Sequence, residues 1–289
     1  MQDPPRTLTG HAKTAGILGW PVGHSRSPRL HGYWLARHGL DGAYIPLPVP
    51  PDRFAAAVRA LADLGFRGAN VTIPHKEAAF AACDHVEEEA RRIGAVNTLV
   101  MRDGRIEGWN TDGWGFLRSI EEQAPDFDAA AGPAVVLGAG GGARAVAAAL
   151  LGAGCPRLTL VNRTPARAEA LAHALAEHGF GTAVDVATTP PLDGAALLVN
   201  TTSQGMQGQP PLVLDVSPLP PHAVVVDIVY VPLETPLLAA ARARGLRAVD
   251  GLGMLLHQGR RGFEAWYGVL PQVDAALRDF VAADIPRTA

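Results

Sequence analysis

The feature that most constrains this 289-residue chain is an apolar run that leads directly into a glycine-rich turn and an alanine-rich stretch. The run is Ala134-Val-Val-Leu, the turn is Gly138-Ala-Gly140-Gly-Gly, and Ala143-Arg-Ala-Val follows. Gly138 permits a tight turn, Gly140 lets the backbone approach a pyrophosphate, and Ala143 lets a helix pack closely on the strand. The pattern predicts a dinucleotide site at the helix N-terminus. A purely structural turn is the alternative in a chain rich in alanine and glycine.

The next predicted strand, residues 158–162, ends in side chains that discriminate between the two nicotinamide cofactors. An NAD-binding domain usually places an acidic residue at this tip, on the ribose 2′-hydroxyl. This tip carries Asn162-Arg163-Thr164 instead, and Arg167 lies one helical turn further on. No carboxylate repels a 2′-phosphate here, and two guanidinium groups can pair with one. We therefore predict NADP; solvated surface charge is the alternative interpretation of Arg163 and Arg167.

Short β-rich runs alternate with helical stretches along the whole chain, which indicates parallel sheets covered by helices. The strands are expected at 15–19, 43–47, 68–73, 98–101, 134–137, 158–162, 183–186, 197–200 and 224–229. The helices are expected at 28–38, 52–64, 76–82, 86–93, 113–122, 142–151, 165–178, 235–244, 254–267 and 272–283. Hydroxyls at Ser27 and Thr164 each precede a proline, and we expect them to cap the helices that start there.

Composition excludes several classes of protein. Hydrophobic residues make up 48% of the chain and charged residues 18%, which suits a folded protein. A net charge of −3 gives no sign of nucleic-acid binding, and two cysteines cannot form a disulfide framework. The first residues lack the apolar stretch of about 7–15 residues that a signal peptide needs. No apolar run approaches the ~18 residues of a membrane span. We expect a cytoplasmic protein with no nucleic-acid or membrane partner.

Polar clusters recur in the first half of the chain, at 19–31, 68–77, 94–98 and 108–113. Each is expected at the carboxyl end of a strand, which is where ligands bind in open α/β sheets. Ser25 and Ser27 either cap a helix or bind the hydroxyls or carboxylate of a ligand. One such cluster is a common turn or cap. Four together favour a binding site.

These motifs resemble the shikimate dehydrogenase family, which includes shikimate/quinate dehydrogenases, and the resemblance covers almost the whole chain. The motifs are GWPVGHSRSPRLH (19–31), GANVTIPHKE (68–77), GAVNTL (94–99), GWNTDGWGF (108–116), GAGGGARAV (138–146), NRTPARAEAL (162–171), NTTSQG (200–205), DIVY (227–230) and DGLGMLLHQ (250–258). The resemblance implies reversible reduction of 3-dehydroshikimate to shikimate with NADPH, on the route to chorismate and the aromatic amino acids.

The fold that the resemblance implies is α/β with two domains. An N-terminal α/β substrate domain would span residues 1–113, and a Rossmann-type, doubly wound parallel-sheet NADP-binding domain would span 114–250. C-terminal helices at 251–289 would return to the first domain.

The family's site residues transfer to individual positions of this sequence. The implied catalytic pair is Lys76 and Asp112. The implied substrate contacts are Ser25, Ser27, Thr72, Lys76, Asn97, Asp112, Tyr230 and Gln258. The implied cofactor contacts are Glu88, Gly138, Ala139, Gly140, Gly141, Gly142, Asn162, Arg163, Thr164, Arg167, Ile228 and Gly251.

The implied chemistry suits these residue types. A cationic Lys76 can stabilise a developing alkoxide and exchange its proton, and a carboxylate at Asp112 can orient the substrate hydroxyl. No metal is expected, because the histidines are dispersed and no H-E-x-x-H or C-x-x-C motif occurs. We expect a small-molecule substrate and a monomer or homodimer. A quinate/shikimate dehydrogenase of broader specificity and a non-catalytic NADP-binding sensor remain alternatives.

Overall fold

The computed structural model describes residues 7–180 and 184–288, which group into two compact units. Unit 1 contains the described residues of Met1–Arg91, Ala95–Thr111 and Gly259–Leu277. Unit 2 contains those of Arg92–Gly94, Asp112–Gln258 and Arg278–Ala289. In this grouping the chain passes between the units at more than two points. The division at 113/114 and 250/251 that the resemblance implies stays a prediction.

Unit 1 is built on a six-stranded sheet with the order β2-β1-β3-β5-β6-β4. Its strands are β1 (Lys13–Gly19), β2 (Gly42–Pro48), β3 (Gly68–Val71), β4 (His85–Val86), β5 (Thr98–Arg102) and β6 (Arg105–Trp109). β2, β1 and β3 are parallel, but β5 is antiparallel to both β3 and β6. The expectation of a wholly parallel sheet is therefore wrong for unit 1. The reversal is a two-residue hairpin at Asp103 and Gly104, with φ of 51° and 73°.

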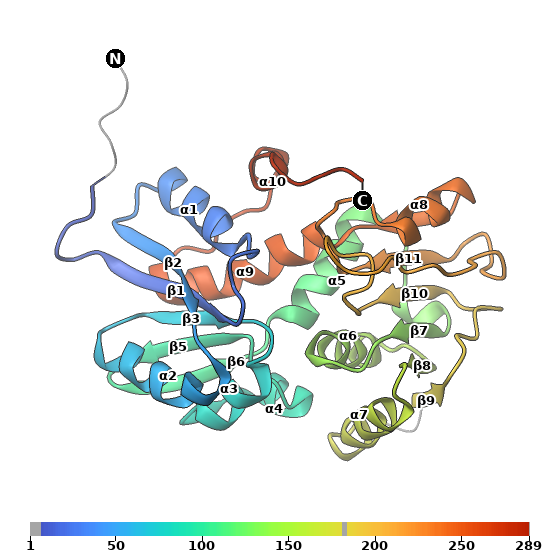
Figure 1. Cartoon of the computed structure of the whole chain (residues 1–289), viewed down its shortest axis with the longest axis horizontal. Coiled ribbons are helices and arrows are strands. Elements are labelled where there is room, and N and C mark those ends of the chain that lie inside the picture. Colours follow the sequence, from blue (N-terminus) through green and yellow to red (C-terminus); the bar gives the residue numbers. More distant parts are fainter. Residues whose placement is uncertain (1–6, 181–183, 289) are drawn as a thin grey trace. The chain divides into compact units, whose positions relative to one another are not determined.

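Helices cover both faces of this sheet (Figure 1). They are α1 (Ser27–Arg37), α2 (Phe54–Asp63), α3 (Lys76–Ala82), the first part of α4 (Glu88–Ile93) and the second part of α9 (Gly251–Tyr267). Phe54 of α2 and Ala79 of α3 belong to a core on one face, and Trp34 of α1 packs against Phe263 of α9 on the other. The helix expected from Val86 begins at Glu88, because Val86 pairs with β6.

Unit 2 is built on a fully parallel sheet with the order β12-β11-β10-β7-β8-β9. Its strands are β7 (Ala134–Leu137), β8 (Leu158–Val161), β9 (Val184–Ala187), β10 (Leu197–Asn200), β11 (Val224–Asp227) and β12 (Arg247–Val249). The strand order reverses between β7 and β10, as in a doubly wound dinucleotide-binding sheet. The predicted Rossmann-type fold is confirmed. The strand expected at 183–186 starts at a residue outside the described range.

The helices of unit 2 are α5 (Asp112–Gln123), α6 (Gly141–Gly152), α7 (Pro165–Glu177), α8 (Pro236–Ala243), the first part of α9 and most of α10 (Ala275–Ala282). α6 and α7 lie on one side of the sheet and α8 on the other (Figure 1). Residues 201–223, all described, contain no helix, and Val216 and Leu219 cover the sheet instead. In the described ranges, no helix has both the length and the apolarity to cross a membrane.

The helix-capping expectations are wrong at both positions. Ser27 is the first residue of α1, and neither Arg26 at its N-cap nor Thr164 at the N-cap of α7 makes a side-chain capping bond. Thr235 does cap its helix, since its hydroxyl accepts the Leu238 N–H at 3.4 Å. The Ser27 hydroxyl is hydrogen-bonded to Tyr44 instead. The Ser27 hydroxyl therefore bonds a residue distant in sequence, and not the first N–H groups of its own helix.

Candidate functional site

The polar motifs of unit 1 meet at one edge of its sheet, where β1, β3 and β6 end and β5 begins. The segments are joined there by backbone hydrogen bonds: Trp20 N–H donates to Ile73 O at 3.1 Å, and Val71 N–H donates to Asn97 O at 2.7 Å. Asn97 precedes its strand, contrary to the expectation that every motif follows one. It reaches the shared edge because β5 is antiparallel.

The two serines occupy different environments. Ser25 is half-buried, and its hydroxyl oxygen accepts the N–H of Ser27 at 3.3 Å, which closes a local turn before α1. Ser27 is 2% exposed and hydrogen-bonded to Tyr44 of the neighbouring strand β2. The alternative in which Ser27 serves only as a helix cap therefore has no support.

Asn97 is held by several hydrogen bonds and is 2% exposed. Its Oδ1 accepts the Thr111 N–H at 2.9 Å and the Thr98 hydroxyl at 2.9 Å, and its Nδ2 donates to Thr111 Oγ1 at 3.1 Å. Because a backbone N–H can only donate, the amide orientation is fixed. The Asn97 amide thus has its oxygen on the Thr111 backbone N–H and presents its N–H side as the other hydrogen-bonding group.

Thr72 and Lys76 lie on the loop between β3 and α3. Lys76 is the first residue of α3 and is half-buried; its carbonyl oxygen accepts the Val96 N–H at 3.0 Å. The intervening His75 bonds Val49 O through Nε2 at 2.8 Å and stacks on Phe54 at 4.5 Å. The loop that presents the expected catalytic lysine is thus anchored on both sides.

The remaining expected substrate contacts belong to unit 2. Asp112 is the first residue of α5 and is 6% exposed. Gln258 packs on the same helix: a Cβ at Gly115 would lie 2.7 Å from Gln258 Cβ. Tyr230 follows β11 and is half-buried. Lys76 and Asp112 thus lie in different units, and their pairing stays a prediction.

The glycine turn of unit 2 has the geometry that the sequence predicts. Gly138 has φ of +114°, and a Cβ there would lie 2.5 Å from Thr201 Oγ1. A Cβ at Gly140, the N-cap of α6, would meet nothing within 4 Å, so that side of the turn is open. Ala139 completes the turn, and α6 starts at Gly141, with N–H groups that lack helical acceptors. A pyrophosphate fits this cradle.

Ile228 joins two other expected cofactor contacts. A Cβ at Gly142 would lie 3.0 Å from Ile228 Cδ1, and a Cβ at Gly251 would lie 2.3 Å from Ile228 O. The start of α6, the segment after β11 and the start of α9 are therefore in close contact. Glycine is required at Gly251 because the approaching group is backbone.

The tip of β8 is also arranged as an anion site would be. Asn162 Nδ2 donates to Thr164 O at 2.9 Å and fixes the turn. Arg163 and Arg167 are exposed, and neither forms an ion pair with a carboxylate in residues 7–180 or 184–288. Glu88, also an expected cofactor contact, is exposed in the first turn of α4 in unit 1.

Sequence reasoning missed a buried carboxylate in unit 2. Asp227 is fully buried at the end of β11; its Oδ1 accepts from Asn200 Nδ2 at 2.9 Å and from the Val229 N–H at 3.0 Å. Its Oδ2 accepts the Thr235 hydroxyl at 2.7 Å. Burial raises the pKa of Asp227 to about 6, against the effect of these donors. Asp227 therefore fixes the segment that carries Ile228 and Tyr230.

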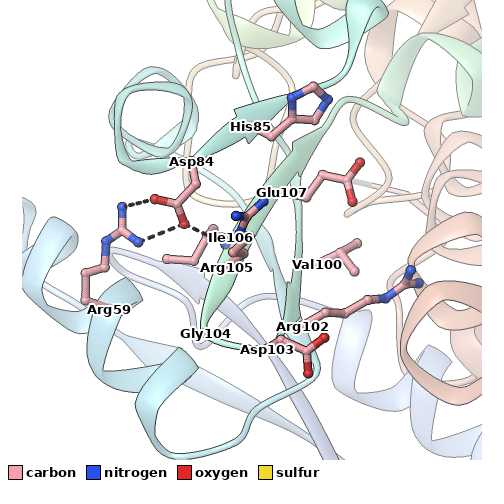
Figure 2. A pocket seen from close by; sticks show the side chains of 10 residues that line it. All are labelled: Arg59, Asp84, His85, Val100, Arg102, Asp103, Gly104, Arg105, Ile106 and Glu107. Atoms are coloured by element: carbon pink, nitrogen blue, oxygen red, sulfur yellow. Dashed lines mark hydrogen bonds and ion pairs between the residues drawn. The ribbon is translucent and has the colours of Figure 1, made fainter.

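A hollow of about 890 Å³ in unit 1 lies apart from all the expected site residues (Figure 2). The β5–β6 hairpin lines it, together with Arg59 and Asp84, which form two hydrogen bonds of 2.8 and 2.9 Å. This contact with Arg59 lowers the pKa of Asp84 to about 2. The hollow is a charged surface region, and Asp84, one of its three acidic residues, is paired with Arg59. The described residues contain no group of three or more metal-ligating side chains.

Comparison with known proteins finds matches to both units. The model of the shikimate dehydrogenase substrate binding domain matches residues 17–99, and that of shikimate / quinate 5-dehydrogenase matches 121–187. A relative from Rhodospirillum rubrum named shikimate dehydrogenase (NADP(+)) is 64% identical over 276 residues, which are 94% of this chain and 97% of the relative.

Solved structures show the same similarity. Shikimate 5-dehydrogenase from Thermus thermophilus, in complex with NADP(H) and shikimate, has a TM-score of 0.81 at 40% identity over 94% of this chain and 98% of that one. Quinate dehydrogenase from Corynebacterium glutamicum, in complex with NAD, has a TM-score of 0.85 at 32% identity over 94% of this chain and 99% of that one.

Proposed function

The chain belongs to the shikimate dehydrogenase family and is an NADP-dependent oxidoreductase; on this premise we propose that it catalyses the reversible reduction of 3-dehydroshikimate to shikimate. The observation that carries the proposal is that the segments bearing Thr72 and Asn97 are joined at one edge of the unit 1 sheet, and that hydrogen bonds connect Ser27 to Asn97. The family's reaction belongs to aromatic amino acid biosynthesis.

The residues of unit 1 suit a small polyhydroxylated acid. Ser25 and Ser27 supply hydroxyl donors for a carboxylate or hydroxyl group, and Thr72 supplies another. Asn97 supplies an N–H donor, because its oxygen is already used by Thr98 and Thr111. Unit 2 adds the phenol of Tyr230 and the amide of Gln258. Groups of this kind bind hydroxyls well, since a buried substrate hydroxyl needs a partner.

Lys76 and Asp112 carry the proton chemistry in this proposal. When the ketone becomes an alcohol, its oxygen must gain a proton, and the Lys76 ammonium can supply it while stabilising the developing negative charge. In the reverse direction Lys76 takes the proton back. Asp112 orients the substrate hydroxyl and, as an opposite charge, favours the ammonium form of Lys76.

NADPH supplies the hydride when bound, and the residues of unit 2 that would hold it have separate tasks. The N–H groups around Gly140 and Gly141 bind the pyrophosphate. Arg163 and Arg167 pair with the 2′-phosphate, and the turn at Asn162 to Thr164 orients them. Ile228 and Gly251 provide a close apolar wall.

Quinate is the second candidate substrate, because a similar fold is found in a quinate dehydrogenase complexed with NAD. Arg163 and Arg167, with no acidic residue at the β8 tip, favour NADP in this chain. The test is an initial-rate assay with shikimate and quinate, each with NADP⁺ and NAD⁺. We expect shikimate with NADP⁺ to give the highest kcat/KM; preference for quinate or NAD⁺ would reject the proposal.

The cytoplasmic location and the monomeric or dimeric state stay predictions.

A further inference from the structure

Tyr44, in β2, lies at the centre of a buried network of hydrogen bonds in unit 1. Its hydroxyl donates to Asn70 Oδ1 at 2.7 Å and is also hydrogen-bonded to Ser27. Asn70 Nδ2 donates to Thr98 Oγ1 at 3.2 Å, and the Thr98 hydroxyl donates to Asn97 Oδ1 at 2.9 Å. We call these five residues the Tyr44 network. None of them is more than 7% exposed.

The direction of every hydrogen bond in the network is fixed by a backbone group. Asn70 Nδ2 also faces the carbonyl oxygen of Asn97 at 3.3 Å, which can only accept. Asn70 Oδ1 must therefore face Tyr44, so the phenol donates to it and accepts from Ser27. At the other end, the Thr111 N–H fixes Oδ1 of Asn97 as the acceptor. The protons consequently point one way, from Ser27 to Asn97.

The ring of Tyr44 is held by aromatic neighbours that offer its hydroxyl no other partner. His31 stacks on it with the ring centroids 4.0 Å apart and the planes 7° from parallel. His31 is itself fully buried, and neither of its ring nitrogens has a hydrogen-bond partner in the described part of the chain. Trp266 lies 5.9 Å from the Tyr44 ring, tilted by 40°. The stack fixes the phenol in the plane where it meets Ser27 and Asn70.

We propose that Tyr44 is a positioning residue for the substrate site, because its hydroxyl joins Ser27 to Asn97 through Asn70 and Thr98. The inference rests on the proposed function, in which Ser27 and Asn97 contact the substrate. Satisfied polar networks in a buried setting rigidify their members, so loss of one link affects the others. The two expected substrate contacts lie far apart in sequence yet share one continuous set of hydrogen bonds.

The test removes only the hydroxyl, with Tyr44→Phe, and compares it with Tyr267→Phe. The Tyr267 hydroxyl is also buried and donates to Ala43 O at 2.8 Å, in the same strand, but it is not part of the network. Tyr44→Phe loses two buried hydrogen bonds and Tyr267→Phe loses one, so both unfolding midpoints should fall, that of Tyr44→Phe somewhat more. Only Tyr44→Phe should raise KM for shikimate, by about 5- to 50-fold, with kcat much less affected. Equal KM values for the two variants overturn the proposal.

A second measurement asks whether Tyr44 acts through Ser27. In a Ser27→Ala background, Tyr44→Phe should add little to KM, because the link it breaks is already absent. Full additivity of the two effects overturns the proposal. If Tyr44→Phe does not fold, Thr98→Val interrupts the network at another link with almost the same shape, and it should also raise KM for shikimate.

The outcomes separate this inference from the proposed function. If wild-type protein does not turn over shikimate, the proposed function fails and the inference fails with it. If it does, and Tyr44→Phe matches the Tyr267→Phe control, only the inference fails. NADPH affinity, followed by nucleotide fluorescence without shikimate, should be unchanged in both variants, because the glycine turn is in unit 2.

Discussion

The two units hold their expected ligand contacts in place by different means. In unit 1 the contacts are tied together by neutral side chains, and the Tyr44 network contains no ionised group. In unit 2 the segment after β11 is organised by the buried carboxylate of Asp227. The difference matches the ligands. A substrate of several hydroxyls needs donors and acceptors of fixed direction, whereas a dinucleotide phosphate needs backbone N–H groups and cations.

The buried titratable groups of the two units also differ in the direction of their pKa shifts. Unit 1 buries a histidine that stays neutral, since burial lowers the pKa of His31 to about 3. Unit 2 buries an acid whose pKa is raised to about 6. Both shifts follow from the cost of a charge in an apolar interior. The contributions of His31 and Asp227 to stability should therefore respond to acid in opposite directions.

The largest expected effect is the loss of kcat on replacing Lys76 in unit 1, while cofactor binding by unit 2 is retained. Lys76→Met keeps the length of the side chain but removes the ammonium, so kcat should fall by about 10²–10⁴-fold with a smaller change in KM. NADPH binding, measured by fluorescence titration, should be retained. Lys13 is the only other lysine in the chain and supplies the matched control, Lys13→Met. Turnover near the wild-type rate would show that Lys76 is an ordinary surface lysine.

The next effect tests unit 2 alone. Arg163→Ala should raise KM for NADP⁺ by roughly 10- to 150-fold and KM for NAD⁺ far less, because a charge-assisted pair contributes about 1.5–3 kcal/mol. Arg157→Ala is the control: that guanidinium is exposed at the start of β8 but is paired with Asp185 at 3.0 Å. Steady-state kinetics with both nucleotides measure the difference. Equal losses for NADP⁺ and NAD⁺ would contradict the assignment of Arg163.

The third prediction concerns acid and unit 1. His31 has a folded-state pKa below its unfolded value of 6.5, so the unfolded chain binds more protons and stability falls as the pH drops below 6.5. Between pH 7.5 and 4.5 the contribution should be about 2–3 kcal/mol. His31→Phe keeps a flat ring and removes the titration. Urea unfolding at both pH values should show wild type losing this amount relative to the variant; parallel losses would mean that His31 is protonated in the fold.

The smallest effect should have the opposite sign and arise in unit 2. Asp227 has a folded-state pKa above its unfolded value of 3.8, so its contribution favours folding in acid and is lost as the pH rises through 6. Relative to Asp227→Asn, wild type should gain about 2 kcal/mol between pH 7.5 and 4.5. The same urea series measures it. If wild type instead lost stability relative to Asp227→Asn on acidification, as it should relative to His31→Phe, the contrast between the units would be wrong.

Sequence reasoning recovered the parts of the fold that depend on local pattern. The strand at 134–137 and the turn at Gly138 are as expected, because an apolar run and a residue with positive φ leave direct traces in the sequence. Three strands were missed, at β4, β6 and β12. β4 and β12 are two and three residues long, and β6 alternates buried residues with exposed or half-buried ones, without a continuous apolar run. Such segments become strands through their neighbours rather than through their own propensity.

The site residues likewise divide into those that a local sequence pattern predicts and those that depend on distant contacts. The glycine turn follows from chemistry visible in the sequence, whereas most other site residues came from the resemblance to a family. Ser27 was open to interpretation as a cap because local partners are the simplest to see. Its actual partner, Tyr44, is on a strand that follows α1, and Asp227 accepts from Asn200 of the neighbouring strand β10 as well as from Val229 and Thr235. Non-local hydrogen bonds leave no periodic signal, so only the structure reveals them.

The division of α9 between the units has a consequence for how the polypeptide emerges from the ribosome. The sheet of unit 1 is complete once Trp109 has been made, but its aromatic side is covered by Phe263 and Trp266. Trp266 also donates to the carbonyl oxygen of Leu99 at 2.9 Å. All strands of unit 2 are therefore translated before unit 1 receives its last piece of core. Until α9 has been made, the Tyr44 ring can stack on His31 but lacks its contact with Trp266. Unit 1 is therefore the first unit to begin and not the first to complete its core.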